Sequence, residues 1–279
     1  MSLIAVGSVL TVVVSPITFA ETEFDFLPDD LKLLEEEIGD IENSESNLDE
    51  DLEYEQDLEI FPGREEDDTG LTVPDLKEGT HVTVKVGNWD VALTDVPVDQ
   101  WFAPYVQDMA EKGVISGYKD AVGVMLGLYG PADSVTIEQI AKIAVEASGV
   151  DQSKCALPTK NKSAVGTWSE VYIACAEHYG WSIYSDGSVD LYRKATRAEV
   201  VTTVLQAFGR DFEMGTGNLF EDVTSTMQVR YAIETAALDG IVGGYTDVYG
   251  EPTGFFGPYD PVNRAETAKI VSLAIQVYQ

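Results

Sequence analysis

The stretch Asn263-Arg264-Ala265-Glu266 opens a long apolar segment, and it decides the fold because it recurs. The same pattern stands 67 residues earlier as Thr196-Arg197-Ala198-Glu199, and 127 residues earlier as Thr136-Ile137-Glu138-Gln139. In each stretch the first side chain can accept a hydrogen bond from the backbone N–H three residues on. The Glu or Gln at that place can reach back to the first N–H, which completes a capping box. The pattern therefore predicts three helices that begin at these positions.

Each predicted helix carries apolar side chains over a wide arc, which is typical of a central rather than a surface helix. These residues are Ile140, Ile143, Ala144 and Ala147; Val200, Val204, Leu205 and Phe208; and Ala268, Ile270, Val271, Ala274 and Ile275. A single copy of about 60 residues is marginal for folding alone. We therefore expect a mainly α protein in which the three helices pack together as one shared core.

A second helix is predicted earlier in each copy, and each ends at a glycine that can adopt the left-handed conformation after a helix. The expected spans are 101–112, 168–179 and 227–239, followed by Gly113, Gly180 and Gly240. The next residues, Val114, Trp181 and Ile241, supply the apolar contact of such helix ends. Copies one and three align without a gap, whereas copy two has a loop seven residues shorter. The copies span 93–150, 151–212 and 213–279.

The net charge of -32 is concentrated near the start of the chain. Residues 21–70 hold 22 acidic residues against Lys32 and Arg64, a balance of -20, whereas 71–279 carry -12. So acidic a segment cannot bury enough apolar surface to offset chain entropy, and it is predicted to be a disordered linker. Nucleic acid is not an expected partner, because phosphate binding needs clustered Lys and Arg.

Residues 1–20 resemble a signal peptide, with an apolar run over 3–14 and small residues at 18 and 20. No Lys or Arg precedes the run, so an uncleaved N-terminal anchor is the alternative. We expect a secreted protein without a membrane span after cleavage, because no later segment is long and apolar enough. Residues 71–92 form a short lead-in, with strand-like alternation over 80–86 and a turn at Gly87-Asn88.

Both cysteines, Cys155 and Cys175, lie in copy two. An exported chain with two cysteines is expected to form a disulfide, and two buried thiols are the alternative. The spacing does not fit a zinc site. Two acidic loops, 186–190 and 246–251, hint at calcium but lack EF-hand spacing, so solvated loop acids are the favoured interpretation. No metal and no cofactor is predicted.

Three further motifs complete the pattern. Phe220-Glu221-Asp222-Val223 precedes the first helix of copy three, with Thr94-Asp95-Val96 as its counterpart, and Gly-Tyr follows at Gly117-Tyr118 and Gly244-Tyr245. With the spacing, the helix-ending glycines and the Thr-Arg-Ala-Glu stretch, residues 93–279 resemble three tandem S-layer homology domains. The resemblance implies a pseudo-threefold arrangement around a central three-helix bundle.

The resemblance also implies anchoring at the cell surface, because such repeats bind secondary cell-wall polysaccharide in the grooves between them, often through a pyruvate ketal. A sugar with a fixed carboxylate calls for a guanidinium to hold the charge and an aromatic surface for the sugar face. Arg197 and Arg264 stand at the first helical position, where the helix end also favours anions. An exposed residue in a first helical turn is the alternative for each.

The remaining candidate binding residues are less specific. The resemblance places Asp95 and Asp222 at the site, and the alternative is a residue that binds the backbone of a turn. Trp101 and Trp168 face either sugar or core. Gly117 and Gly244 allow either a close backbone approach or a plain turn. Copy one has Ile137 in place of the arginine and copy two lacks the Phe-x-Asp-Val motif, so only copy three keeps every element.

The sequence holds no catalytic motif of a known hydrolase, nucleotide-binding or metalloprotease type. We therefore expect a non-catalytic wall-binding protein. A peptidoglycan-binding envelope tether is the first alternative. A secreted carbohydrate-active enzyme is the second, and it would need a further domain, for which no segment outside the repeats is both long and apolar enough.

Overall fold

The computed structural model describes residues 71–86, 88–212 and 219–279. The predicted signal peptide and acidic linker lie outside the described residues. Contacts between Cα atoms divide the chain into one unit of Met1–Asp51 with Ala121–Gly123, and a second unit of Leu52–Asp120 with Val124–Gln279. Every helix and strand of the described residues belongs to the second unit.

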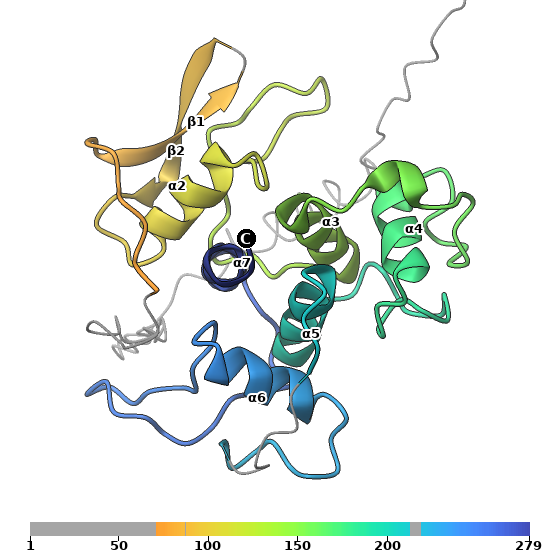
Figure 1. The fold of residues 1–279 in the computed structure, drawn as a ribbon. Coiled ribbons are helices and arrows are strands. Elements are labelled where there is room, and N and C mark those ends of the chain that lie inside the picture. The colour runs from red at the N-terminus through yellow and green to blue at the C-terminus, as the bar shows by residue number, and fades with distance from the viewer. Residues whose placement is uncertain (1–70, 87, 213–218) are drawn as a thin grey trace, which may run out of the picture. The chain divides into compact units, whose positions relative to one another are not determined.

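The second unit is rich in helix and carries one small sheet (Figure 1). In chain order its elements are β1 (His81–Val86), β2 (Trp89–Pro97), α2 (Ala103–Glu111), α3 (Ile137–Ser148), η2 (Gln152–Lys154), α4 (Glu170–His178), α5 (Arg197–Ala207), α6 (Arg230–Leu238) and α7 (Arg264–Tyr278). The predicted helices are all present, each with its ends within a few residues of the expected ones.

The three predicted capping boxes are confirmed. Thr136, Thr196 and Asn263 each accept the N–H three residues on, at 3.4, 3.4 and 2.8 Å. The side chains of the Gln or Glu at that place accept the return bond at 3.1, 2.9 and 2.9 Å. The helices α3, α5 and α7 therefore begin where local chemistry alone directs them to begin.

Removing a cap gives a direct measure of this effect. Asn263→Ala is expected to lower the free energy of unfolding by about 0.5–2 kcal/mol, because the Glu266 N–H loses its acceptor. Asn263→Ser keeps an acceptor oxygen and should remain close to the unaltered protein in a urea denaturation series. An unchanged midpoint for Asn263→Ala would contradict the role of the cap.

The helices before each loop end as predicted, at glycines with left-handed backbone. Gly113, Gly180 and Gly240 have φ of 72°, 69° and 74°. The next residue in each copy donates its N–H to the carbonyl five residues earlier, as in Val114 to Met109 at 3.0 Å, which is the bond of a Schellman motif. Val114, Trp181 and Ile241 are buried, so the chain turns away from each helix over an apolar contact.

The helices that follow the capping boxes lie at the centre of this unit. Helices α3, α5 and α7 contact one another in all three pairs. Each also packs against the first helix of the following copy: α3 against α4, α5 against α6, and α7 against α2 (Figure 1). No copy buries its central helix against its own first helix alone, which explains physically why the copies occur together.

Backbone hydrogen bonds tie the three copies to one another just before these helices. Val135 donates to the Val262 carbonyl at 3.0 Å, Val262 donates to the Ala195 carbonyl at 3.2 Å, and Ala195 donates to the Val135 carbonyl at 2.8 Å. The three residues occupy the same place in their copies. Equivalent backbone groups therefore form a closed ring of three bonds.

The predicted strand of the lead-in is confirmed, and it has a partner that the sequence did not indicate. Strand β1 pairs in antiparallel fashion with β2. Strand β2 runs through Asp95 and Val96, which mark the start of copy one. The lead-in is thus paired with the first copy and is not a separate element.

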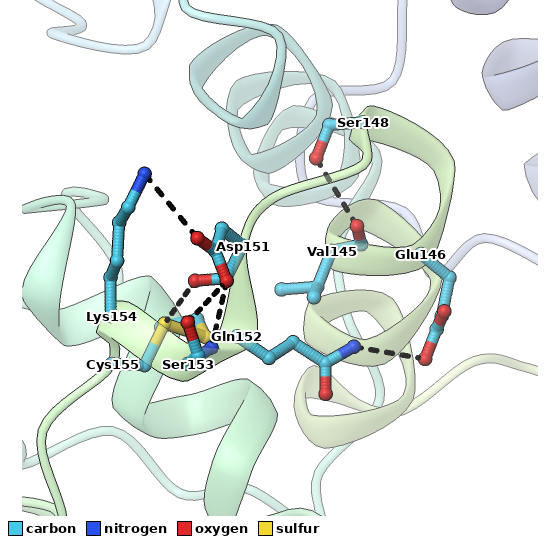
Figure 2. The surroundings of a disulfide bond; sticks show 9 residues. Val145, Glu146, Ser148, Asp151, Gln152, Ser153, Lys154 and Cys155 are labelled. Atoms are coloured by element: carbon cyan, nitrogen blue, oxygen red, sulfur yellow. Dashed lines mark hydrogen bonds and ion pairs between the residues drawn. A yellow bond between two sulfur atoms is a disulfide. The ribbon is translucent and has the colours of Figure 1, made fainter.

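A disulfide joins Cys155 to Cys175, and both residues are buried (Figure 2). Cys155 follows the short helix η2, whose first turn is held by Asp151: its carboxylate accepts the Ser153 N–H at 3.1 Å. Cys175 lies in α4. The bond therefore fixes the start of copy two to its first helix.

Within the described residues, no helix is long and apolar enough to span a membrane.

Candidate functional site

Arg264, the first residue of α7, extends into the loop of copy one. Its Nε donates to the Tyr129 carbonyl at 2.7 Å and an Nη atom donates to the Ser116 carbonyl at 3.2 Å. The guanidinium lies over the rings of Tyr118 and Tyr129, at 4.9 and 4.5 Å from their centroids. Arg264 remains partly exposed, so it combines fixed geometry with access to solvent.

Arg197 makes the corresponding contacts one copy further on, but it is almost fully buried, with 2% of its surface exposed. An Nη atom donates to the Gly243 carbonyl at 3.0 Å. The guanidinium lies 4.9 Å from the ring centroid of Tyr245 and 4.8 Å from that of Phe256. Two arginines that look alike in the sequence are therefore placed differently with respect to solvent.

The backbone N–H groups at these helix starts are already engaged. The Arg264 and Ala265 N–H groups donate to the Asp133 and Pro131 carbonyls at 2.9 and 3.0 Å. The first two N–H groups of α3 and α5 donate in the same way to the loop of the following copy. These groups, which the sequence suggested as an aid to anion binding, instead join neighbouring copies.

Asp95 and Asp222 hold their own loops closed. The Asp95 carboxylate accepts the N–H groups of Tyr129 and Gly130, at 2.8 and 2.7 Å. Asp222 binds Phe256 and Gly257 in the same way, each at 2.8 Å. Both carboxylates thus fix the loops on which the arginines rest.

Copy two, which lacks the Phe-x-Asp-Val motif, uses a different residue for this purpose. The buried Asn161 donates from Nδ2 to the Val189 carbonyl at 2.8 Å. The tie closes 28 residues instead of 35, which matches the loop that is seven residues shorter. No sequence signal points to Asn161 beyond its place ahead of the helix.

Gly117 and Gly244 permit a close approach between the two arms of each loop. A Cβ atom on Gly117 would lie 2.5 Å from the Leu128 carbonyl oxygen, and one on Gly244 would lie 2.8 Å from that of Phe255. The neighbouring N–H groups of Tyr118 and Tyr245 donate to these same two carbonyls, both at 2.7 Å. The glycines therefore shape the loop itself.

Trp101 and Trp168 are partly exposed, and each lies beside a lysine that sequence reasoning missed. The ammonium group of Lys269 is 5.9 Å from the Trp101 ring and 5.8 Å from the Tyr105 ring. Lys142 stands 5.7 Å from the Trp168 ring and 5.9 Å from that of Tyr172. The available signal was the match of Lys142 with Lys269 at the offset of 127 residues.

A cavity of about 420 Å³ lies in front of Lys269. Its lining includes the loop of copy three around Gly243 and Gly244, Glu266 and Lys269 of α7, and Tyr105 of α2. Arg197 binds this loop through the Gly243 carbonyl, and its charge reaches Lys269. We call this set groove A: Arg197, Gly244, Lys269, Trp101 and Tyr105.

Equivalent residues gather at a second place, which we call groove B: Arg264, Gly117, Lys142, Trp168 and Tyr172. Arg264 holds the carbonyl of Ser116 beside Gly117, and its charge acts on Lys142. In each groove the arginine comes from one copy, the lysine and glycine from two positions that meet it, and the aromatic rings from a neighbouring first helix. No single copy contains a complete groove.

The third combination of copies has none of these groups. Ile137 replaces the arginine, Thr202 replaces the lysine, and Gln228 and Ala232 replace the tryptophan and tyrosine. Ile137 is fully buried, and its carbonyl accepts the Tyr184 hydroxyl at 2.9 Å. Arginine, lysine and aromatic residues are thus kept together or replaced together.

Burial lowers the pKa of Lys269 to about 8, and the charge of Arg197 acts in the same direction. Burial also lowers the pKa of Lys142. Between pH 8 and the ordinary value of 10.5 for lysine, the unfolded chain binds the proton of residue 269 more tightly than the folded one. The contribution of Lys269 to the free energy of unfolding therefore rises as the pH increases through this window.

Comparison with Lys269→Met tests this pH dependence. Between pH 8 and 10.5 the unaltered protein should gain stability relative to the variant, by up to about 1.4 kcal/mol for each tenfold fall in proton concentration. Urea denaturation at a series of pH values measures the difference. A constant difference across the window would contradict a lowered pKa of Lys269.

Comparison with known proteins agrees with this arrangement. The family model of the S-layer homology domain matches residues 93–136 and 219–268. The chain is 26% identical over 199 residues to an S-layer protein of Bacillus licheniformis, which covers 67% of this chain and 20% of the relative. It is 27% identical over 192 residues to S-layer protein EA1 of Bacillus anthracis, with the same coverage. The chain thus spans about a fifth of the length of these relatives.

These matches show S-layer homology domains on both sides of copy two, and the chain belongs to the S-layer homology domain family. Copy two lies outside the two matched regions and is related to them by its helices, capping box and loop tie.

Proposed function

We propose that this protein is a non-catalytic anchor, which attaches to the cell wall by binding secondary cell-wall polysaccharide in grooves A and B. The observation that carries the proposal is the joint presence of arginine, lysine and aromatic rings in two grooves and their joint absence from the third place. Residues kept only for packing would not be expected to change together. Family membership supports attachment to the envelope.

We further propose that the three copies close into a pseudo-threefold unit around a bundle of α3, α5 and α7. The ring of bonds among Val135, Val262 and Ala195 supports this arrangement, as does the cyclic packing of central helices on first helices. Closure matters for function because each groove draws residues from more than one copy. Opening a junction would dismantle the groove that it forms.

The chemistry of the grooves fits a sugar that bears a carboxylate, such as a pyruvate ketal. The fixed guanidinium of Arg264 and the ammonium of Lys142 offer two cationic donors to a carboxylate. The partly exposed Trp168 offers an apolar face to a pyranose ring. A partly desolvated cation discriminates anionic from neutral sugars more strongly than an exposed one. The ligand class that we propose is therefore an anionic, pyruvylated polysaccharide.

The proposal is tested by sedimentation with purified cell-wall sacculi. The protein should pellet with intact sacculi and stay in the supernatant after mild acid has removed the secondary polymer. Free pyruvylated glycoside should compete, and the matching glycoside without the ketal should not.

Two other results would redirect the assignment. Unchanged pelleting after acid treatment would mean that peptidoglycan itself is the ligand, as for an envelope tether. Release of reducing sugar from the sacculi over time would mean that the chain is an enzyme.

A further inference from the structure

One wall of groove A is built from the first described residues of the chain. Leu71, Thr72 and Val73 line the same cavity as Lys269. The Thr72 N–H donates to Oε1 of Gln276 at 3.1 Å, and Nε2 of Gln276 donates to the Thr72 carbonyl at 3.0 Å. This two-way clamp fixes to α7 the point at which the chain reaches the groove.

A second clamp holds the segment that follows. Lys77 donates its N–H to Oε1 of Gln107 at 3.1 Å, and Nε2 of Gln107 donates to the Asp75 carbonyl at 3.3 Å. Gln107 is a buried residue of α2. The segment 71–77 is therefore tied to both helices that border groove A.

Four consecutive acidic residues, Glu65-Glu66-Asp67-Asp68, stand just ahead of this wall. Three residues of fully extended chain span at most about 11 Å, so the Cα atom of Asp68 lies within that distance of Leu71. A tether this short holds the carboxylates near the groove at an effective concentration in the millimolar range or above. Groove B has no such tether in the described part of the chain.

Groove A complements these carboxylates in charge. Arg197 and Lys269 supply two positive groups, and burial raises the pKa of Glu266, the acidic residue of the cavity lining. The remaining fold is acidic overall, so the acidic run has few cationic partners elsewhere. Complementary charge of this kind selects one docking place among several.

We infer that Glu65–Asp68 dock in groove A of the same chain and compete there with the anionic wall polymer. Groove A is then open only when the polymer or salt displaces the run, whereas groove B is open at all times. The docking follows from this chain alone, and only the competition rests on the proposed function.

Carbodiimide cross-linking of the full chain tests the docking without any wall ligand. Digestion and mass spectrometry are expected to find isopeptide bonds from residues 65–68 to Lys269, and to find them depleted in about 0.5 M NaCl, where screening is strong. Lys142 is the internal control, because it has a similar aromatic setting in the groove that lacks the tether. Cross-links to Lys142 and Lys269 in equal yield, or none to Lys269, would overturn the inference.

The fourfold variant E65Q/E66Q/D67N/D68N tests the competition. At low salt it should bind a pyruvylated methyl glycoside in groove A about threefold to tenfold more tightly than the unaltered chain, as expected for removal of a tethered competitor. The gain should vanish in Lys269→Gln and persist in Lys142→Gln. Equal affinities of the variant and the unaltered chain would overturn the competition. A cross-link to Lys269 with no glycoside binding by either protein would support the docking and count against the proposed function.

Discussion

Arg264→Ala is expected to lose sedimentation with cell-wall sacculi, with apparent affinity reduced at least about tenfold. A hydrogen bond to a charged group contributes about 1.5–3 kcal/mol, which corresponds to roughly a 10-fold to 150-fold change in affinity. Loss of groove B also leaves a single groove, and the gain from binding a repeated polymer at two places disappears with it. Both effects act in the same direction.

The controls separate recognition from folding. Arg264 also binds the carbonyls of Tyr129 and Ser116, so some loss of stability accompanies its removal, and the melting curve must be measured beside the binding. Arg193→Gln removes the same charge away from both grooves, where Arg193 pairs with Glu199, and should keep its sedimentation. Arg264→Lys keeps the charge without the planar fork and should be intermediate. Full sedimentation of a folded Arg264→Ala would remove Arg264 from the site.

Arg197→Ala should act mainly on stability, because only 2% of this side chain is exposed. Its removal empties the space between the Tyr245 and Phe256 rings and leaves the Gly243 carbonyl without its donor. Truncation of a large buried side chain costs about 2–5 kcal/mol. We expect a loss in this range for Arg197→Ala, and a smaller loss for the partly exposed Arg264.

Urea denaturation of the two alanine variants side by side tests this ranking. Arg197→Met restores much of the buried volume without the charge, and should recover part of the loss. The prediction fails if Arg197→Ala is no more destabilised than Arg264→Ala. It also fails if Arg197→Met is as unstable as the alanine variant.

Local chemistry made the helices predictable. The capping boxes at Thr136, Thr196 and Asn263 and the left-handed Gly113 depend on groups at most a few residues apart, so the sequence contains the whole interaction. Strand β1 was predicted for the same reason. Its partner β2 was not, because pairing depends on the register between two segments, which the sequence pattern did not reveal.

The functional site was only partly predictable. The repeats singled out Arg197 and Arg264, and the motif comparison singled out Asp95 and Asp222. The contacts of each depend on residues tens to more than a hundred positions away, such as Tyr129 with Arg264. The lysines were missed because Lys142 and Lys269 stand inside helices that the pattern marks as core.

By itself, the sequence determined three copies of one unit, the ends of their helices and the absence of an arginine at position 137. Only the tertiary structure decided that each groove is assembled from more than one copy, that Arg197 is buried while Arg264 is partly exposed, and that Lys142 and Lys269 face aromatic rings. The physical reason is that helix ends are set by hydrogen bonds between near neighbours in the chain. Burial and groove composition are set by packing between copies, in which equivalent residues have different neighbours.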